Sequence, residues 1–166
     1  MRFCSFCGCD RKDGDRCPDC GDASYSIRPN RSHQKYLRKT GRIRTTKLIV
    51  AGPEYLDGEA FVKRKLNSLC QNLKDIQLFI AGKRGIAKNI DSWASHDIRV
   101  GAISFFPVEP GKDKRAMGIK RNEEIIEESG AKQTIIFNDG EDSIILSLIL
   151  MCRKAGIVVR VVNLPE

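Results

Sequence analysis

The sequence has no apolar stretch that approaches the roughly 20 residues needed to cross a bilayer. Its N-terminus, Met-Arg-Phe-Cys, also lacks the apolar block of a signal peptide. We therefore expect a soluble, cytoplasmic protein with no membrane partner. Its 166 residues suffice for one ordinary domain and a small appendage, but not for two full hydrophobic cores.

Histidine is also scarce, since the chain holds only His33 and His96. No Ser/His/Asp set can be identified from the sequence. His96 follows Trp93 near the expected end of a helix, where an imidazole more often interacts with the helix dipole than acts as a catalytic base. The sequence therefore names no catalytic residue.

Acidic residues are absent from residues 23–46. Residues 1–46 hold 11 Lys/Arg and 5 Asp/Glu, whereas residues 47–166 hold 18 and 16, so most of the excess positive charge is N-terminal. Such a basic arm could neutralise several phosphates, and Tyr25 and Tyr36 could stack on unpaired bases. We predict that the arm binds DNA or RNA, with a solvated linker as the alternative. Its cations are Arg28, Arg31, Lys35, Arg38, Lys39, Arg42 and Arg44.

Residues 1–22 have few apolar side chains but contain two Cys-x-x-Cys-Gly turns, with nine residues between the inner cysteines. Two residues between a pair of cysteines let one tight turn direct both sulfurs at one ion, and two such turns complete a closed tetrahedral set. We predict a zinc knuckle, similar to a zinc ribbon, with a structural Zn²⁺ as its cofactor. A protein partner could bind this knuckle. The predicted ligands are Cys4, Cys7, Cys17 and Cys20.

Two alternatives to this zinc set stay open. Cys9 could replace Cys7 as a ligand, although the spacing favours Cys7. Alternatively, the Cys-x-x-Cys turns could form redox-active pairs instead of binding zinc. However, the thiol-exchange motif normally occurs once and opens a helix after a strand. Cys70 and Cys152 occur singly in helical patterns, which fits a reducing compartment better than a disulfide framework.

From Lys47 onward, short apolar runs alternate with helix-length amphipathic stretches. This alternation predicts an α/β fold, with a Rossmann-like parallel sheet of about five strands and flanking helices over residues 47–166. The predicted strands are Leu48–Ala51, Ile76–Ala81, Val100–Phe106, Thr134–Phe137 and Ile157–Val162.

Four helices are expected between these strands. The first follows a possible N-cap at Asp57 and carries an apolar face that includes Val62, Leu66, Leu69 and Leu73. The last is apolar nearly all round, and we expect it to be deeply buried. The second, third and fourth helices are expected around Ile86–Trp93, Ala116–Ser129 and Ser143–Ala155.

In open parallel sheets, ligands bind at the carboxyl ends of the strands, where loops and helix N-termini present unpaired backbone N–H groups. Three loops satisfy this rule here. They follow the first, second and fourth predicted strands, and the second combines two glycines with two cations, as suits a phosphate. The loops are Gly52–Tyr55, Gly82–Gly85 and Asn138–Glu141.

The order of elements and several local motifs resemble the SLOG superfamily of Rossmann-like proteins. This superfamily includes the YpsA/YspA-like group, the LOG phosphoribohydrolases and the DNA-processing protein DprA. Gly82–Gly85 is similar to its Gly-x-Arg-Gly turn, and Gly118–Asn122 to its Gly-x-x-Arg-Asn motif. Leu48–Gly52, Phe137–Gly140 and Ala155–Ile157 are similar to its opening strand, its glycine turn and the end of its final helix.

The resemblance implies a site for a nucleotide or a nucleotide derivative. Arg84 and Arg121 would be phosphate or carboxylate partners, and Asn122 would orient the ligand or the loop. Where the family has a phosphate-binding Gly-Thr, however, this chain has Glu141-Asp142, and Ile145 stands near the position of the LOG catalytic glutamate. These acids either recognise a sugar hydroxyl or amine, or simply cap the helix.

We therefore expect a non-enzymatic, nucleotide-binding protein that acts with nucleic acid or a nucleic-acid-processing machine and is encoded by a phage or mobile element. An N-glycosidic hydrolase and a protein-protein adaptor with a degenerate site are the alternatives. The predicted ligand-binding residues are Gly52, Gly82, Lys83, Arg84, Gly85, Arg121, Asn122, Asp139, Gly140 and Glu141.

Overall fold

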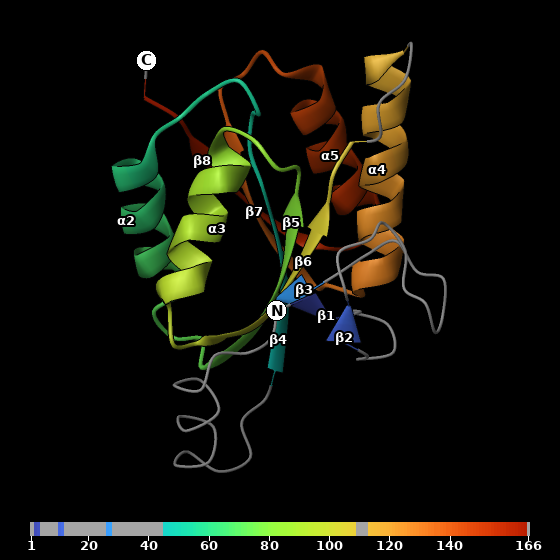
Figure 1. Ribbon diagram of the computed structural model, residues 1–166. Coiled ribbons are helices and arrows are strands. Elements are labelled where there is room, and N and C mark those ends of the chain that lie inside the picture. The colour runs from blue at the N-terminus through green and yellow to red at the C-terminus, as the bar shows by residue number, and fades with distance from the viewer. Residues whose placement is uncertain (1, 4–9, 12–25, 28–44, 109–112, 166) are drawn as a thin grey trace.

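The computed structural model describes residues 2–3, 10–11, 26–27, 45–108 and 113–165. Four helices cover a parallel sheet in this part of the chain (Figure 1). The strands of the parallel sheet are β4 (Thr45–Ala51), β5 (Asp75–Ala81), β6 (Val100–Phe106), β7 (Gln133–Asn138) and β8 (Val158–Asn163). The helices are α2 (Glu59–Leu69), α3 (Ile86–His96), α4 (Lys114–Ser129) and α5 (Ser143–Lys154).

The five parallel strands lie in the order β6-β5-β4-β7-β8. The chain therefore builds outward from β4 to β6, and then crosses back to continue on the other side of β4 with β7. This is the Rossmann-like arrangement, and the strand order reverses between β4 and β7. The prediction of a five-stranded parallel α/β sheet is confirmed.

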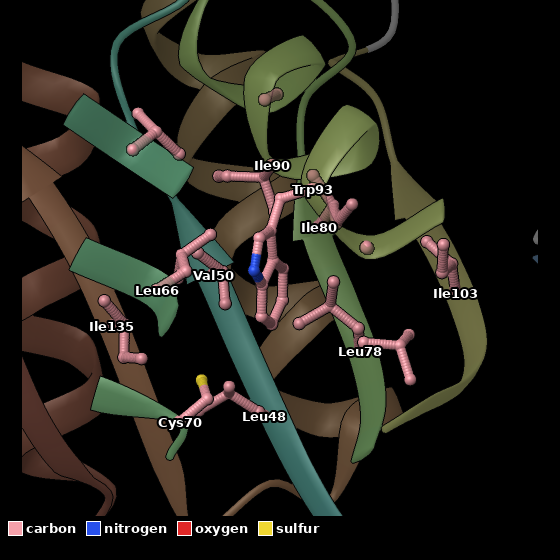
Figure 2. Close-up of a cluster of buried hydrophobic side chains, with 14 of the residues drawn as sticks. Leu48, Val50, Leu66, Cys70, Leu78, Ile80, Ile90, Trp93, Ile103 and Ile135 are labelled. Carbon is pink, nitrogen blue, oxygen red and sulfur yellow. The ribbon is translucent and has the colours of Figure 1, made fainter. Parts of the chain in front are cut away.

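Each face of the sheet has its own hydrophobic core, because successive side chains of a strand point to opposite faces. Leu48 and Val50 of β4 pack toward α2 and α3, whereas Ile49 and Ala51 pack toward α4 and α5. Figure 2 shows the first core, with the Trp93 indole at its centre. Both faces of the sheet are therefore buried, as parallel strands require.

The predicted element bounds are close to those observed. Strand β6 agrees at both ends, and α4 ends at Gly130, which has the left-handed φ of 60° common at helix C-termini. The prediction of Asp57 as an N-cap was wrong. Gly58 is at that position, and the Asp57 carboxylate instead accepts a 2.8 Å hydrogen bond from Asn89 of α3.

The expectation that α5 is deeply buried holds for only one side of the helix. Its inner face is fully covered, and Leu148 is 0% exposed. On its outer face Leu150 is 65% exposed. The helix covers the sheet with one side only, and the apolar residues on its other side face solvent.

Three further strands of two residues each extend the sheet beyond β6. They are antiparallel to their neighbours, and β3 pairs directly with β6. No strand was expected before Lys47, because two-residue strands carry no periodic pattern. These strands are β1 (Arg2–Phe3), β2 (Asp10–Arg11) and β3 (Ser26–Ile27).

None of the helices in the described part of the chain combines the length and the apolar character needed to cross a membrane.

The two sides of α5 provide a stability test with matched substitutions. Leu148→Ala leaves a cavity in the core and should lower the free energy of unfolding by about 2–5 kcal/mol. Leu150→Ala removes an exposed side chain and should change it by less than about 0.5 kcal/mol. Urea unfolding followed by circular dichroism measures both. Equal losses for the two variants would contradict the observed orientation of α5.

Candidate functional site at the carboxyl edge of the sheet

The carboxyl ends of the parallel strands meet at one edge of the sheet, called here the carboxyl edge. The loops that follow β4, β5 and β7 lie there, and they carry most of the ligand-binding residues predicted from the sequence. Arg121 and Asn122 come from the middle of α4, which follows β6. The fold thus brings to one edge residues separated by up to 89 positions, from Gly52 to Glu141.

Arg121 is the most unusual residue of this edge, because its side chain is only 4% exposed. Its Nε donates a 3.1 Å hydrogen bond to Oδ1 of Asn122, and Nη1 lies 3.5 Å from the carbonyl oxygen of Phe106. No carboxylate of the described residues lies within 4 Å of the guanidinium. A charge desolvated in this way is costly unless other charges compensate it.

Two acids near the carboxyl edge provide that compensation. Burial lowers the pKa of Arg121, and the negative charges of Glu54 and Asp142 oppose this effect. Glu54 belongs to the loop after β4, and Asp142 precedes α5. The buried cation is therefore stabilised by acids from both sides of the point at which the strand order reverses.

Asn122 is fully buried and connects α4 to α5. Its Nδ2 donates a 3.0 Å hydrogen bond to the carbonyl oxygen of Ile144, while its Oδ1 accepts from Arg121. Gly118 lies one turn earlier on α4, where an added Cβ would come within 2.5 Å of the Ile144 side chain. Asn122 thus orients Arg121 within a tight contact between two helices.

The turn Gly82–Gly85 lies between β5 and α3. Gly82 donates a 2.9 Å hydrogen bond to the same Phe106 carbonyl that Arg121 approaches, so the turn and the guanidinium are neighbours. Lys83 and Arg84 are exposed. The backbone amides of Arg84 and Gly85 donate to no backbone carbonyl of the described residues. This geometry suits the approach of an anion to the start of α3.

The loop after β4 packs closely onto the same turn. Gly85 has a φ of 57°, and an added Cβ there would come within 2.5 Å of the carbonyl oxygen of Glu54. The amide of Ile86, the first residue of α3, donates to the Pro53 carbonyl at 3.2 Å. Gly52 faces the Ile86 side chain with no room for a Cβ. Glycine is required at these positions because backbone and side chain approach so closely.

The loop after β7 is organised by the carboxylate of Asp139. Oδ1 accepts hydrogen bonds from the amides of Glu141 and Asp142, and Oδ2 accepts one from the hydroxyl of Tyr55. This last bond connects the loops after β4 and β7. Gly140, with a φ of 86°, and Glu141 are exposed at the tip.

Asp142 caps α5, since its carboxylate accepts from the amides of Ile144 and Ile145 at 2.9 and 3.2 Å. The interpretation of this acid as a helix cap is therefore confirmed. Its carboxylate takes the first amides of α5, which would otherwise be available to a ligand phosphate.

The charges of the carboxyl edge are divided between its two halves. One half is the loop after β7, which carries the acids Asp139, Glu141 and Asp142, whereas Glu54 of the loop after β4 packs against the turn of the other half. On the other half, the turn after β5 carries Lys83 and Arg84, and exposed Lys114 and Arg115 begin α4 after β6. Cations at a helix N-terminus oppose the helix dipole, so their presence there favours a role in binding an anion.

The two buried cysteines, Cys70 and Cys152, are not suited to act as reactive thiols. Burial raises the pKa of Cys70 and of Cys152 to about 11, so both thiols are protonated at neutral pH. The four predicted zinc ligands and the seven cations of the basic arm lie outside the described residues. In the part of the chain that the structure describes, no three His, Cys, Asp or Glu side chains gather as a metal site.

No family model matches the sequence, and no curated protein sequence does either. Among solved structures, the chain is similar to the UDP-GlcNAc 2-epimerase from Neisseria meningitidis bound to UDP-GlcNAc. The TM-score is 0.47 and the identity 12%, over 72% of this chain and 32% of that one. A second UDP-N-acetylglucosamine 2-epimerase gives 0.45 and 11%, over 72% and 33%. The chain thus spans about a third of the length of these proteins. The resemblance to the SLOG superfamily stays a prediction.

The cap of α5 can be tested by substitution. Asp142→Ala removes the acceptor of two amides and should lower the free energy of unfolding by about 1 kcal/mol. Glu141→Ala is the matched control, because this neighbouring carboxylate accepts no hydrogen bond among the described residues, and a change below about 0.5 kcal/mol is expected. Thermal unfolding at pH 7 measures both. A smaller loss for Asp142→Ala than for Glu141→Ala would contradict the assigned cap.

Proposed function

We propose that the chain binds a small phosphorylated ligand of the nucleotide class at the carboxyl edge of its sheet. The observation that carries this proposal is the buried guanidinium of Arg121, beside the Gly82–Gly85 turn and without an ion pair within 4 Å among the described residues. Ionisable groups that burial perturbs cluster at functional sites, where an anion can compensate a buried cation.

The strand order supports the same location. In open parallel sheets, ligands bind outside the carboxyl ends of the strands, where the order reverses. Here the reversal falls between β4 and β7, whose loops are joined by the Tyr55–Asp139 hydrogen bond. The phosphate would lie toward the basic half of the edge, and hydroxyl or amine groups of the ligand would face its acidic half.

The role of this site is binding rather than catalysis in our proposal. Two acids of the loop after β7 are engaged in structure, since Asp139 holds its loop and Asp142 caps a helix. Neither carboxylate is therefore available as a general base without a loss of local structure. Binding of DNA or RNA by the basic arm stays a prediction.

Calorimetric titration with AMP, GMP, CMP, UMP and inorganic phosphate tests the proposed ligand class. Arg84→Ala should weaken the binding of any nucleotide that binds about tenfold, because a charge-assisted hydrogen bond contributes about 1.5–3 kcal/mol. Lys120→Ala removes an exposed cation from the middle of α4 and should have little effect. No heat from any nucleotide, or equal weakening by both substitutions, would contradict the proposal.

The N-terminal cysteines carry a second, independent proposal. The spacing of the two Cys-x-x-Cys-Gly turns favours one structural zinc ion held by Cys4, Cys7, Cys17 and Cys20. Native mass spectrometry of the intact chain should show one bound zinc. Cys4→Ser should lose the metal, whereas Cys9→Ser should keep it. Loss from Cys9→Ser together with retention by Cys7→Ser would assign the ligand position to Cys9.

A further inference from the structure

Glu54 lies against the turn that the proposed ligand would approach. An added Cβ on Gly82 would come within 2.5 Å of the Glu54 Oε1 atom and within 3.4 Å of its Cδ and Cγ atoms. The Glu54 side chain therefore lies along Gly82, whose φ of 106° is itself accessible mainly to glycine. The backbone carbonyl of the same residue packs on Gly85. Glu54 thus covers the turn at both of its glycines.

The position of this carboxylate is one that favours negative charge. Gly82 donates to the Phe106 carbonyl that Arg121 approaches, so the Glu54 carboxylate and the guanidinium lie near the same strand ends. Lys83 and Arg84 follow Gly82 directly, and α3 begins at Ile86 with the positive end of its dipole. The surroundings that would attract a phosphate are those in which Glu54 is found.

Glu54 also differs from the other acids of the carboxyl edge in what it holds in place. Asp139 and Asp142 accept hydrogen bonds from backbone amides of their loop and helix. Among the described residues, none donates a hydrogen bond to the Glu54 carboxylate, and Glu54 is exposed to solvent. Its side chain can therefore turn toward solvent without breaking the loop or a helix cap.

We propose that the Glu54 carboxylate occupies the position of the ligand's anionic group, so that a phosphate must displace it in order to bind. This inference rests on the proposed function. Glu54 then acts as a specificity-determining residue: it neutralises Arg121 when no anion is bound, and it weakens the binding of free anions. A ligand binds well only if its remaining groups, on the acidic half of the edge, offset the displacement of Glu54.

The experiment compares the wild-type chain with Glu54→Gln and with a control, Glu127→Gln. Glu127 is exposed and lies near the C-terminal end of α4, away from the carboxyl edge. Inorganic phosphate and AMP are titrated into each by calorimetry, and thermal unfolding is recorded with and without phosphate. Glu54→Gln should bind phosphate about tenfold more tightly than the wild type, because the anion no longer has to displace a negatively charged carboxylate that the surrounding cations favour. It should also unfold at a lower temperature without phosphate and recover when phosphate is added.

The outcomes separate this inference from the proposal on which it rests. If the wild type binds AMP and Glu54→Gln binds phosphate and AMP no more tightly, Glu54 does not compete with the ligand, and the inference alone is overturned. If Glu54→Gln is destabilised but phosphate does not restore it, while AMP still binds the wild type, Glu54 has a structural role only, and the inference is again overturned. If no variant binds either probe, the proposed function fails and the inference with it. Equal tightening in Glu127→Gln would show a general charge effect and would also overturn the inference.

Discussion

The carboxyl edge depends on keeping one buried guanidinium charged. Arg121 is 4% exposed and has no ion pair within 4 Å among the described residues, so its solvation comes from Asn122, the Phe106 carbonyl and the charges of Glu54 and Asp142. Desolvating such an ion costs several kcal/mol, which the surroundings must offset. The acids of two separate loops are therefore held near it, and their positions shape the whole edge.

Close packing fixes these positions. Gly118 lets α4 approach Ile144 of α5, which brings Asn122 within hydrogen-bonding distance of the Ile144 carbonyl. On the opposite face, Gly85 lets the backbone of Glu54 rest on the start of α3. Helices α3 and α4 are thus positioned by glycines that leave no space for a Cβ. Arg121 reaches the carboxyl edge from α4, whereas Glu54 comes from the loop at the end of β4.

Much of this fold is predictable from the sequence because its strands are short apolar runs bounded by turn residues. Val100–Phe106 was correct at both ends, and the start of α5 was correct because Asp142 is a strong capping residue. Asp57 was misassigned because Asn89, 32 residues away, takes its carboxylate, and no local pattern reports that contact. The exposure of Leu150 could not be predicted either, because an apolar residue has the same signature on both sides of a helix.

The candidate site shows the same limit. The motif pattern directs attention to Arg121 and to Gly82–Gly85, and the structure brings them to a shared carbonyl at Phe106. The motif pattern did not identify Glu54 as part of the site, because the sequence spacing of a single acid in a loop does not relate it to Gly82, 28 positions later. A signal for Glu54 could have come from charge balance, since a buried arginine requires a nearby acid.

The division of charge along the edge has a consequence for the kind of ligand that fits. A free phosphate at the basic half would lie close to the cations after β5 and β6, but also close to the Glu54 carboxylate. Like charges that lie close together repel strongly where they are partly desolvated. A ligand that adds hydroxyl or amine donors could use the exposed Glu141 carboxylate on the other half. If the proposed function holds, selectivity at this edge would favour molecules that combine an anionic group with hydrogen-bond donors, and this combination is what distinguishes a nucleotide from a simple anion.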